Sequence, residues 1–399
     1  MIIIGHPGRQ HSHQFATAIF EEGYRIRYCS GQFDVHQISA VPAFLRNFLP
    51  VAILRNLVPF IAIGVHITWP FGVALHHVAR QRSMRRFQFW GEWAGFAAFD
   101  FWLASQIAVH RPQIVIAYEM SALRAFRVAA QHGALCVLDA AACHHHLQDS
   151  RLGVDSSTPL SKVEELIRAR KDEEILLADL VICPSTLSAE SYVAAGVPVD
   201  KVVVNTLGVD AEMFAEAAAR SRTGVPHFAF IANSAYVKGA DFIASAVASL
   251  QEGNYSAVVD LVGGAHVEVI SSETVLVVRH GHLSPKGIAE VLAKADCLLL
   301  PSRLESFGMV VLEALAAGVP VLVSRWAGAS TMIEEDITGW TFDSDPDVFV
   351  SRVRWCAANV MQLRSMRTAC VNSARQHSWT AYRLRAAKII GGLVNDLNG

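Results

Sequence analysis

Short apolar runs that alternate with helical patterns are the feature that most constrains the fold of this chain. Ile2–Ile4, Ile114–Ala117 and Leu180–Cys183 in the first half, and Phe228–Ile231 and Cys297–Leu300 in the second, are each followed by turn residues and then a helix-like stretch. Continuous apolar runs of this length are typical of parallel strands that helices cover on both faces. The pattern predicts an α/β fold with doubly wound parallel sheets, whose ligand sites lie at the carboxyl ends of the strands.

The length of the chain predicts two such domains. A chain of 399 residues exceeds one ordinary hydrophobic core, and its 52% of hydrophobic residues are enough to fill two. The turn-forming stretch Asn205–Asp210 follows an apolar run and marks the expected boundary. We therefore expect residues 1–207 to form an N-terminal Rossmann-like domain and residues 208–375 a C-terminal one.

Charge and cysteine usage exclude several classes of protein. The formal net charge of -2 offers no basic field for nucleic acid, so no nucleic-acid partner is expected. The seven cysteines form no Cys-x-x-Cys pair, which argues against a zinc knuckle or a disulfide framework and favours a reducing, cytoplasmic compartment. The stretch Met1–Gly5 is expected to open a buried strand rather than a signal peptide, because it lacks a basic leading region and a cleavage site.

The segment Phe44–Ala79 is unusually rich in Leu, Ile, Val and Phe. Arginine and proline residues interrupt it, so no apolar run of about 18 residues remains and a membrane span is not expected. The following stretch, Arg80–Trp90, is basic and then aromatic. Two interpretations stay open: these segments cover the first sheet, or they lie in a bilayer interface and hold the protein on the cytoplasmic membrane face.

The segment Leu298–Val321 carries the strongest indication of a binding site. A buried strand is followed by a loop that carries Glu305, and a helix is expected from about Ser306 to about Ala317. The free N–H groups and the positive dipole end at the start of this helix would bind a diphosphate without any side chain. Gly308 would let the backbone come close to such a ligand.

Glu313 lies about two turns into this helix, among apolar neighbours. A carboxylate in such surroundings is costly unless it is hydrogen-bonded, and the vicinal hydroxyls of a ribose are suitable donors. An exposed glutamate on an amphipathic helix is the ordinary alternative. Because the helix is apolar almost all round, we expect it to be buried, and we favour a ligand-binding role for Glu313.

Glu305 and Glu313 are separated by seven residues. Their context resembles the family 4 (group 1) retaining glycosyltransferases, which have the GT-B fold of two Rossmann-like domains facing each other across a cleft. The likeness is strong from Ala178 onward and weak across Gln32–Val109. The matching motif residues are Pro301, Ser302, Phe307, Gly308, Ala314, Ala316, Gly318, Pro320 and Val321, and further similar stretches are Ala178–Ser185, Asn205–Asp210, Val237–Gly239, Ala327–Gly339 and His377–Trp379.

The resemblance implies that residues 376–399 form a helix that crosses back to the first domain. It implies transfer of a sugar from a nucleotide sugar to a glycan or lipid-linked acceptor with retention of anomeric configuration, as in the synthesis of cell-surface polysaccharides or glycolipids. Glu313 would bind the donor ribose, Glu305 the transferred sugar and Lys238 the diphosphate. Lys238 and the helix dipole would stand in for a metal ion, so neither a metal nor a cofactor is expected. The expected donor-binding set is completed by Asn233, Ser306, Phe307, Gly308 and His282.

Two positions depart from the family pattern. Asn233 stands five residues before Lys238, where many members have an arginine, and we interpret it as a hydrogen-bond donor. Asp139 occupies a place where a histidine is frequent, and the cluster His144–His146 follows it. Such a cluster is compatible with a metal site, but no cysteine or carboxylate stands at clear ligand spacing. We therefore predict an active-site loop beside the acceptor, with His145 as the catalytic candidate.

The loop Gly5–Gln14 would face the cleft in a GT-B enzyme. It is poor in glycine and does not fit the Gly-x-Gly-x-x-Gly phosphate cradle. We expect Gly8, Ser12 and His13 to lie at the cleft and to reach donor or acceptor. A plain helix N-cap at Ser12 is the alternative.

Two other classes of function stay open. Another GT-B enzyme, such as a sugar-nucleotide epimerase, would share the donor site, whereas a phosphorylase would need a pyridoxal lysine in a much longer chain. A non-catalytic sugar-nucleotide-binding protein is suggested by Asn233 and Asp139. The presence of Glu305, Glu313 and Lys238 together argues against it.

Overall fold

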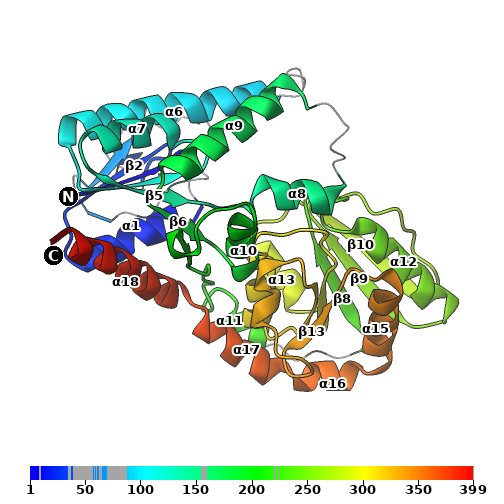
Figure 1. The fold of residues 1–399 in the computed structure, drawn as a ribbon. Helices are drawn as coiled ribbons and strands as arrows, with labels where there is room; N and C mark the ends of the chain where they lie inside the picture. The colour runs from blue at the N-terminus through cyan, green and yellow to red at the C-terminus, as the bar shows by residue number, and fades with distance from the viewer. Residues whose placement is uncertain are drawn as a thin grey trace.

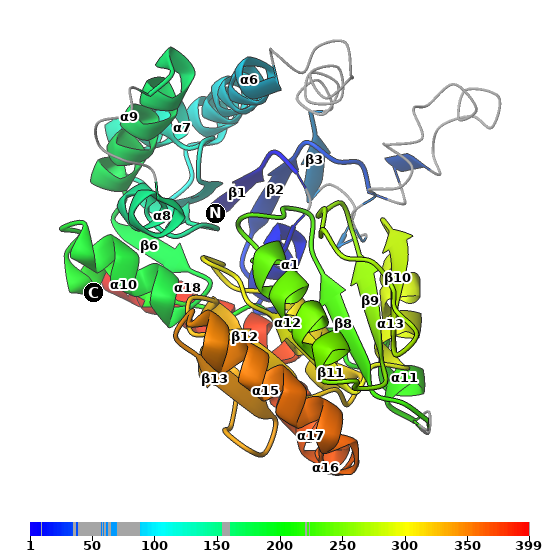
Figure 2. The same cartoon turned by 90° about the vertical axis from the view of Figure 1, so that its right-hand side faces the viewer.

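The computed structural model describes residues 1–8, 10–34, 37–38, 57, 59, 61–62, 65–69, 88–153, 160–219, 222 and 224–398. These residues form two α/β domains, each built on a parallel sheet (Figures 1 and 2). The predicted fold class is therefore confirmed. Most of the apolar segment Phe44–Ala79 and of the basic stretch after it lies outside the described residues. Among the helices that are described, none is both long and apolar enough to cross a bilayer.

The first domain contains a sheet whose described strands follow the order β3-β2-β1-β4-β5-β6-β7 and are all parallel. The order reverses between β1 and β4, so ligand sites are expected beyond the carboxyl ends of these central strands. The strands are β1 (Ile2–His6), β2 (Ile26–Ser30), β3 (His66–Thr68), β4 (Ile114–Tyr118), β5 (Leu135–Asp139), β6 (Leu180–Cys183) and β7 (Val202–Val204).

Helices cover both faces of this sheet. On one face, Ile4 and Tyr28 of the strands pack against Phe15 of α1 and against Tyr382 and Ile390 of α18. On the other face, α6 and α7 supply the large buried side chains, with α9 lying across α7 (Figure 1). The helices are α1 (Ser12–Glu21), α6 (Gln88–His110), α7 (Leu123–Gln131), α8 (His145–Leu152), α9 (Lys162–Leu177), α10 (Thr186–Ala194), the 3-10 turn η2 (Val199–Lys201) and α18 (Trp379–Asn398).

The second domain contains a parallel sheet whose described strands follow the order β10-β9-β8-β11-β12-β13. One continuous apolar core joins this sheet to the helices on both its faces. The strands are β8 (His227–Ile231), β9 (Ala257–Val262), β10 (Val275–Gly281), β11 (Cys297–Leu300), β12 (Val321–Ser324) and β13 (Gly339–Phe342), and the helices are α11 (Ala215–Ala219), α12 (Ala240–Glu252), α13 (Pro285–Leu292), α14 (Met309–Ala316), η3 (Gly328–Met332), α15 (Pro346–Ala358), α16 (Val360–Ser365) and α17 (Arg367–Gln376).

The described chain passes between the domains at two places that are bonded to each other. The Val209 amide donates to the carbonyl oxygen of His377 at 2.9 Å. Arg385 of α18 donates to Asn205 Oδ1 at 3.2 Å and to the Thr206 carbonyl at 2.6 Å. The last helix thus ties the first passage to the first domain, and the two chain ends lie on the same side of that domain (Figure 1).

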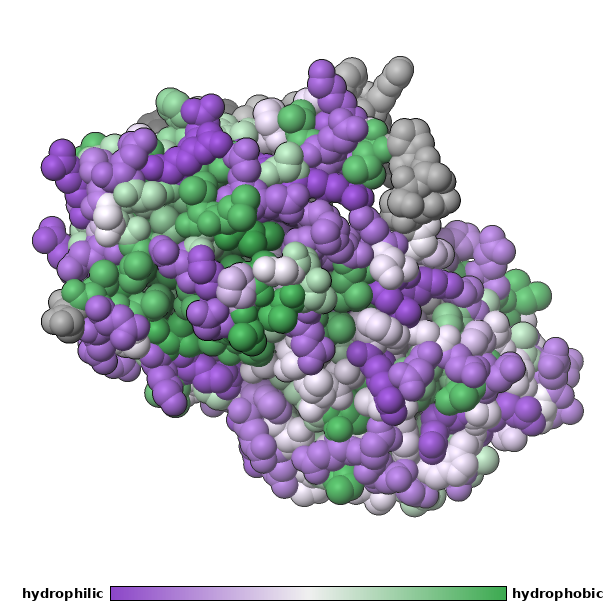
Figure 3. All heavy atoms as spheres, in the orientation of Figure 1, coloured by the Kyte–Doolittle hydropathy of each residue, from purple (hydrophilic) through white to green (hydrophobic). Residues whose placement is uncertain are grey.

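The two domains differ in the surface that they present. On the face drawn in Figure 3, apolar residues gather on the half that belongs to the first domain, whereas the half that belongs to the second domain is mainly polar. Figure 1 shows α8 between the two domains on this side. At the junction of the domains, α10 of the first domain packs against η3 of the second.

Candidate active site

The turn after β8 places Lys238 against the loop that follows β11. Gly239, which precedes α12, has a φ of 71°, and a Cβ there would lie 2.1 Å from the carbonyl oxygen of Pro301. The Arg303 amide donates to the Val237 carbonyl at 2.8 Å, which fastens the two segments together. Lys238 and Glu305 consequently form an ion pair. Partial burial lowers the pKa of Lys238 to about 8.

Backbone bonds on both sides hold Glu305 in place. Its amide donates to the Trp326 carbonyl at 2.8 Å, and its carbonyl accepts from the Gly328 amide at 2.9 Å. The same pattern continues one step further, where the Ala329 amide donates to the carbonyl of the buried Phe307 at 2.7 Å. These backbone hydrogen bonds join the loop after β11 to the loop after β12. They fix the backbone of Glu305 and so limit where its carboxylate can lie.

The helix after this loop begins later than its sequence suggests. A start near Ser306 is wrong: α14 begins at Met309, and Gly308 precedes it with a φ of 99°. A positive φ cannot be part of a right-handed helix, whose residues have φ near about −60°, and glycine adopts it at little cost. The first amides of α14 therefore open next to Glu305, whose Cγ lies 3.3 Å from the position of a Cβ on Gly308. An anion at this helix start would meet both free N–H groups and Lys238.

Glu313 is half-buried on α14 and has no side-chain hydrogen bond or ion pair among the described residues. Burial raises the pKa of its carboxyl to about 7. An isolated carboxylate in such a place is costly, and a ligand with hydroxyl donors would remove that cost. The carboxylate of Glu313 is therefore available to a ligand, and its role in donor binding stays a prediction.

Asn233 and His282 lie together beside the Gly263–Gly264 turn. The Asn233 side-chain oxygen accepts from the Gly264 amide at 3.2 Å, and no described residue accepts from its NH₂ group. His282 is exposed, and its Nε2 lies 3.2 Å from the position of a Cβ on Gly264. The turn has room only for glycine at 263, where φ is 102° and a Cβ would lie 2.1 Å from the Ala232 carbonyl. Asn233 keeps two N–H donors for a ligand.

Ser306 connects the two domains. Its hydroxyl accepts from the Cys143 amide at 2.9 Å, and its carbonyl accepts from the Ser185 hydroxyl at 2.6 Å. The loops after β5 and β6 of the first sheet therefore touch the loop after β11 of the second. Ser306, predicted only as a donor-binding residue, is also an interdomain contact.

The end of α8 adds a second interdomain contact. The Arg151 guanidinium lies 3.8 Å above the ring of Trp326 and donates to Ser344 Oγ at 3.2 Å. The Tyr236 hydroxyl, next to the Lys238 turn, donates to the Leu152 carbonyl at 3.3 Å. The described domains are thus in contact on both sides of Glu305.

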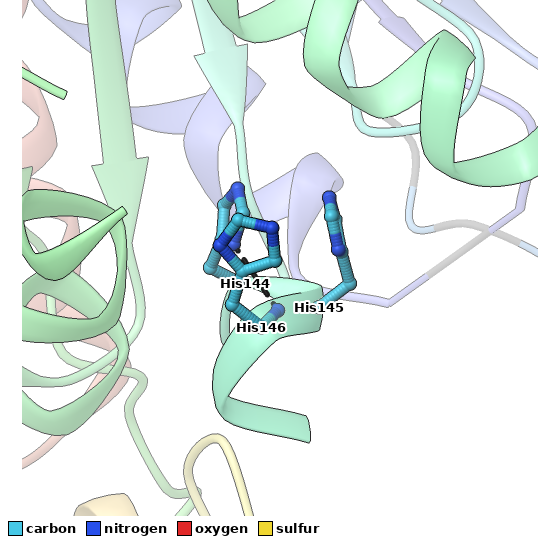
Figure 4. A group of neighbouring side chains, drawn as sticks. All are labelled: His144, His145 and His146. Carbon is cyan, nitrogen blue, oxygen red and sulfur yellow. Dashed lines mark hydrogen bonds between the residues drawn. The ribbon is translucent and has the colours of Figure 1, made fainter. Parts of the chain in front are cut away.

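The histidine cluster opens α8. His145 Nε2 is hydrogen-bonded to Asp172 Oδ1 of α9 at 2.7 Å, and His144 Nδ1 accepts from the His146 amide at 3.3 Å. Figure 4 shows the three rings projecting from the first turn of α8. Burial, followed by its histidine neighbours, lowers the pKa of His144 to about 4. No carboxylate stands at ligand spacing in the sequence, and Asp172 reaches the cluster from another helix, α9.

Sequence reasoning missed a buried pair at the end of the first sheet. His11 Nε2 is hydrogen-bonded to Asp139 Oδ1 at 3.0 Å, and both side chains are nearly buried. Burial works against charge on both groups, but their mutual attraction holds the pKa of His11 above and that of Asp139 below its ordinary value. Beside them, burial lowers the pKa of His6 to about 4, and the ring of His6 packs against that of Tyr118 in a tilted arrangement, with centroids 4.1 Å apart. The available signal was that His6 and Asp139 end β1 and β5, which lie on either side of β4 in the sheet.

The other residues of the first-domain loop lie partly inside the protein. The alternative of an N-cap at Ser12 is wrong: His11 holds that position without a side-chain capping bond. Ser12 is buried in the first turn of α1, where its Oγ is 2.8 Å from the Tyr28 hydroxyl, and His13 is buried next to it. The Gly8 amide donates to His6 Nδ1 at 2.8 Å. Gly8 therefore lies at the sheet end, whereas Ser12 and His13 support α1.

The chain contains Asp-x-Asp spacings at 343–345 and 345–347, which in other settings hold a metal. Here Asp345 accepts from the Asp347 and Val348 amides and so caps α15. Asp343 pairs with Arg325 at 3.2 Å, and both side chains are exposed. These aspartates are explained by the helix start and the surface pair.

A family model describes the second half of the chain. Residues 214–377 match the model of the glycosyl transferases group 1. The second domain is a group 1 glycosyl transferase domain. The segment that matches contains the Lys238–Glu305 pair and Glu313, so the elements described above are those of the group 1 domain.

Curated relatives resemble the chain over similar ranges. A D-inositol 3-phosphate glycosyltransferase of Segniliparus rotundus is 29% identical over 200 residues, which are 45% of this chain and 44% of that protein. Glycogen synthase of Mycobacterium tuberculosis is 28% identical over 167 residues, 40% of each protein. The chain therefore spans less than half the length of these two relatives.

Solved structures resemble the whole chain. Sucrose-phosphate synthase from Thermosynechococcus elongatus has a TM-score of 0.69 at 14% identity and covers 99% of both chains. HepE from Anabaena, solved with UDP and glucose, has a TM-score of 0.63 at 15% identity and covers 98% of this chain and 99% of its own. These likenesses show that the group 1 domain is joined to its partner domain in the GT-B fold.

Proposed function

We propose that this protein transfers a sugar from a nucleotide sugar to a glycan or lipid-linked acceptor, with retention of anomeric configuration, in the synthesis of a cell-surface polysaccharide or glycolipid. The observation that carries the proposal is the Lys238–Glu305 pair at the start of α14, with the unpartnered Glu313 on the same helix. A cation, free helix amides and two carboxylates match the diphosphate, the sugar and the ribose of such a donor.

Each group has a distinct task in the proposed reaction. Lys238 and the first amides of α14 neutralise the diphosphate as it leaves, which stabilises the developing negative charge. Glu305 orients the transferred sugar, and Glu313 accepts hydrogen bonds from the ribose. The bond from the anomeric carbon to the phosphate oxygen breaks, the acceptor oxygen bonds to the same face of that carbon, and the acceptor proton passes to the departing phosphate.

The acceptor belongs on the first domain. His6 and Asp139 end β1 and β5, His11 precedes α1, and His145 opens the helix that follows β5. The Cys143 amide bonds to Ser306 at 2.9 Å, so this group lies beside the loop that carries Glu305. Polar side chains in a buried setting suit recognition of sugar hydroxyls.

The comparisons support a nucleotide-sugar donor. HepE was solved with UDP and glucose, and the curated relatives are named glycosyltransferases and glycogen synthases. Neither Asp-x-Asp spacing is free for a metal, since Asp345 caps a helix and Asp343 pairs with Arg325. Protein groups then neutralise the diphosphate, and we expect transfer to persist in EDTA.

The test is release of nucleoside diphosphate from a panel of nucleotide sugars, with and without glycan and lipid-linked acceptors. Lys238→Ala should lower turnover by about 100-fold or more, because a charge that stabilises the transition state is lost. Glu305→Gln should also mainly lower turnover. The control is Lys294→Ala, which changes an exposed lysine of the same domain.

The outcomes separate the alternatives. Product whose donor sugar is epimerised rather than transferred, read by NMR, would identify a sugar-nucleotide epimerase. Tight nucleotide binding without turnover of any donor would identify a binding protein. Wild-type kinetics in both Lys238→Ala and Glu305→Gln would refute the assignment of the site.

We further propose that the protein attaches to the cytoplasmic face of a membrane through the segment 44–90. This segment lies largely outside the described residues, and the proposal rests on its apolar and basic composition. Vesicles that contain anionic lipid should sediment the protein at low salt and release it at high salt. Replacing Arg82, Arg85 and Arg86 by Gln should abolish this binding, whereas equal binding by that variant would contradict it.

A further inference from the structure

Three imidazoles converge at the start of α8, outside the groups that bind the donor. One ligand-capable nitrogen atom from each of His144, His145 and His146 lies within 4.8 Å of the other two. Their ring centroids are 4.2 to 4.6 Å apart (Figure 4). The convergence arises because the chain turns here: His144 has extended backbone with a ψ of 143°, and the helix starts only at the next residue.

His145 is prepared for a ligand in a specific way. Its Nε2 is held by Asp172 Oδ1 at 2.7 Å, whereas its Nδ1 is buried and has no hydrogen-bond partner among the described residues. When Nε2 donates its proton to the carboxylate, Nδ1 of the neutral ring carries a lone pair. A buried acceptor without a partner is unfavourable, and a carboxylate behind a histidine is the usual support of a metal-ligating ring.

We propose that His144, His145 and His146 bind one divalent transition-metal ion of the Zn²⁺ class, with Asp172 orienting His145. Imidazole nitrogen suits zinc, copper and nickel, whereas magnesium and calcium prefer oxygen ligands. The site is distinct from the proposed diphosphate site, which is formed by Lys238 and α14. The proposal does not depend on the glycosyl-transfer assignment, since it concerns metal binding alone.

The geometry needs only small adjustments. Zinc binds imidazole nitrogen at about 2.0–2.1 Å, so nitrogens in a tetrahedral site lie about 3.3 Å apart. The observed upper limit of 4.8 Å can close by rotation of the rings about their side-chain bonds. To bind the metal through Nδ1, His144 would give up the hydrogen bond that Nδ1 accepts from the His146 amide. At 3.3 Å this hydrogen bond is long and therefore weak. The fourth position stays open to water.

The position of the site gives the metal a structural consequence. His144 follows Cys143, whose amide bonds to the Ser306 hydroxyl of the second domain at 2.9 Å. Asp172 belongs to α9, so an occupied site would fasten the first turn of α8 to α9 next to that interdomain bond. We therefore expect the metal to stabilise this part of the domain junction.

The experiment uses the full-length chain without a polyhistidine tag, stripped with a chelator and then titrated with Zn²⁺ against a chromophoric competitor. The wild type should bind one equivalent tightly. His146→Gln and Asp172→Asn should each weaken binding by about tenfold or more, because one removes a ligand and the other the group that orients one. The matched controls are His132→Gln and Glu173→Gln, which alter an exposed histidine elsewhere and the carboxylate next to Asp172.

A second measurement distinguishes loss of metal binding from loss of folding. Thermal unfolding in chelator should be the same for all five proteins, and added Zn²⁺ should raise the midpoint for the wild type and the two controls only. Co²⁺ should give the absorption of a tetrahedral nitrogen site in the wild type and lose it in His146→Gln. Failure to bind one equivalent of Zn²⁺, or unchanged affinity in His146→Gln, overturns the proposal.

Discussion

At the residue scale, burial sets the charge state of the donor-site groups. Glu313 has apolar neighbours on its helix and no described partner, so its pKa is raised to about 7. Lys238 is also partly buried, and its pKa is lowered to about 8. Both groups therefore titrate close to neutral pH, where binding of a charged ligand would favour their ionised forms.

The raised pKa of Glu313 predicts a pH dependence of stability. A carboxyl whose folded pKa exceeds its unfolded value of about 4.3 stabilises the fold fully below that value, and this contribution is lost as pH rises through about 7. The free energy of unfolding of Glu313→Gln should therefore exceed that of the wild type at pH 8 by on the order of 1–3 kcal/mol, and the two values should be equal at pH 4. Chemical denaturation at the two pH values measures the difference.

Nucleotide affinity gives the opposite response in the same variant. Ribose hydroxyls donate to the ionised carboxylate, so the ratio of wild-type to Glu313→Gln affinity should rise between pH 6 and pH 8 and reach about tenfold at pH 8. The titration of Lys238 in this range affects both proteins alike and cancels in the ratio. Glu252→Gln, an exposed carboxyl at the end of α12, is the control. For the stability prediction, free energies of unfolding that vary with pH in the same way for Glu313→Gln and wild type would show that Glu313 is solvated in the folded protein.

Local spacing made Glu305 and Glu313 recognisable in the sequence, because both belong to one strand–loop–helix unit. His11 and Asp139 were not recognisable as a pair, since 128 residues separate them and only the sheet order brings them together. The same holds for His145 and Asp172, which are 27 residues apart on different helices. Short-range chemistry could be predicted, whereas pairs between elements needed the tertiary structure.

At the element scale, the start of α14 depends on one glycine. Gly308 has a φ of 99°, and a Cβ there would lie 3.3 Å from Glu305 Cγ. The predicted helix extended too far toward its N-terminus because apolar periodicity does not reveal a left-handed residue. Because α14 begins only at Met309, its first amides lie next to the Lys238–Glu305 ion pair. Gly308 therefore shapes the site as well as the turn before the helix.

Gly308→Ala should therefore reduce both stability and activity. The left-handed backbone costs an alanine about 1–2 kcal/mol, and its methyl group presses on Glu305. Gly196 is a matched control, because its φ is 97° and no described atom lies within 4 Å of the place that a methyl group would take there. Gly196→Ala should lose similar stability but keep kcat, and calorimetry with steady-state kinetics compares the two. Equal activity in both variants would separate Gly308 from the donor site.

At the scale of the whole molecule, the two passages between the domains form one joint. Val209 and Ser378 pair as a parallel bridge, and a Cβ on Gly208 would lie 2.6 Å from the Trp379 amide nitrogen. The backbone of Gly208 therefore cannot rotate independently of Trp379, and the two passages must move together when the domains move. A surface pocket of about 630 Å³, lined in part by Asp210 and Arg383, lies beside them.

Contacts on the far side of the molecule oppose opening of this joint. Arg151 stacks on Trp326 and bonds to Ser344, while Tyr236 bonds to Leu152. These contacts are few and partly exposed, and interfaces of this kind permit domain motion. A donor and an acceptor bound on facing domains would add contacts and shift the equilibrium toward the closed arrangement.

We expect small-angle scattering to show a smaller radius of gyration when nucleoside diphosphate and acceptor are both bound. Arg151→Ala should enlarge the radius of the free protein and raise the KM for the donor, because it removes a contact that holds the domains together without touching the proposed chemistry. Arg127→Ala is the control, since Arg127 pairs with Glu173 on the outer surface of the first domain. If saturating ligands left the radius of gyration unchanged while activity was intact, the enzyme would work from a preformed cleft. The contacts at the end of α8 would then hold one fixed arrangement of the domains.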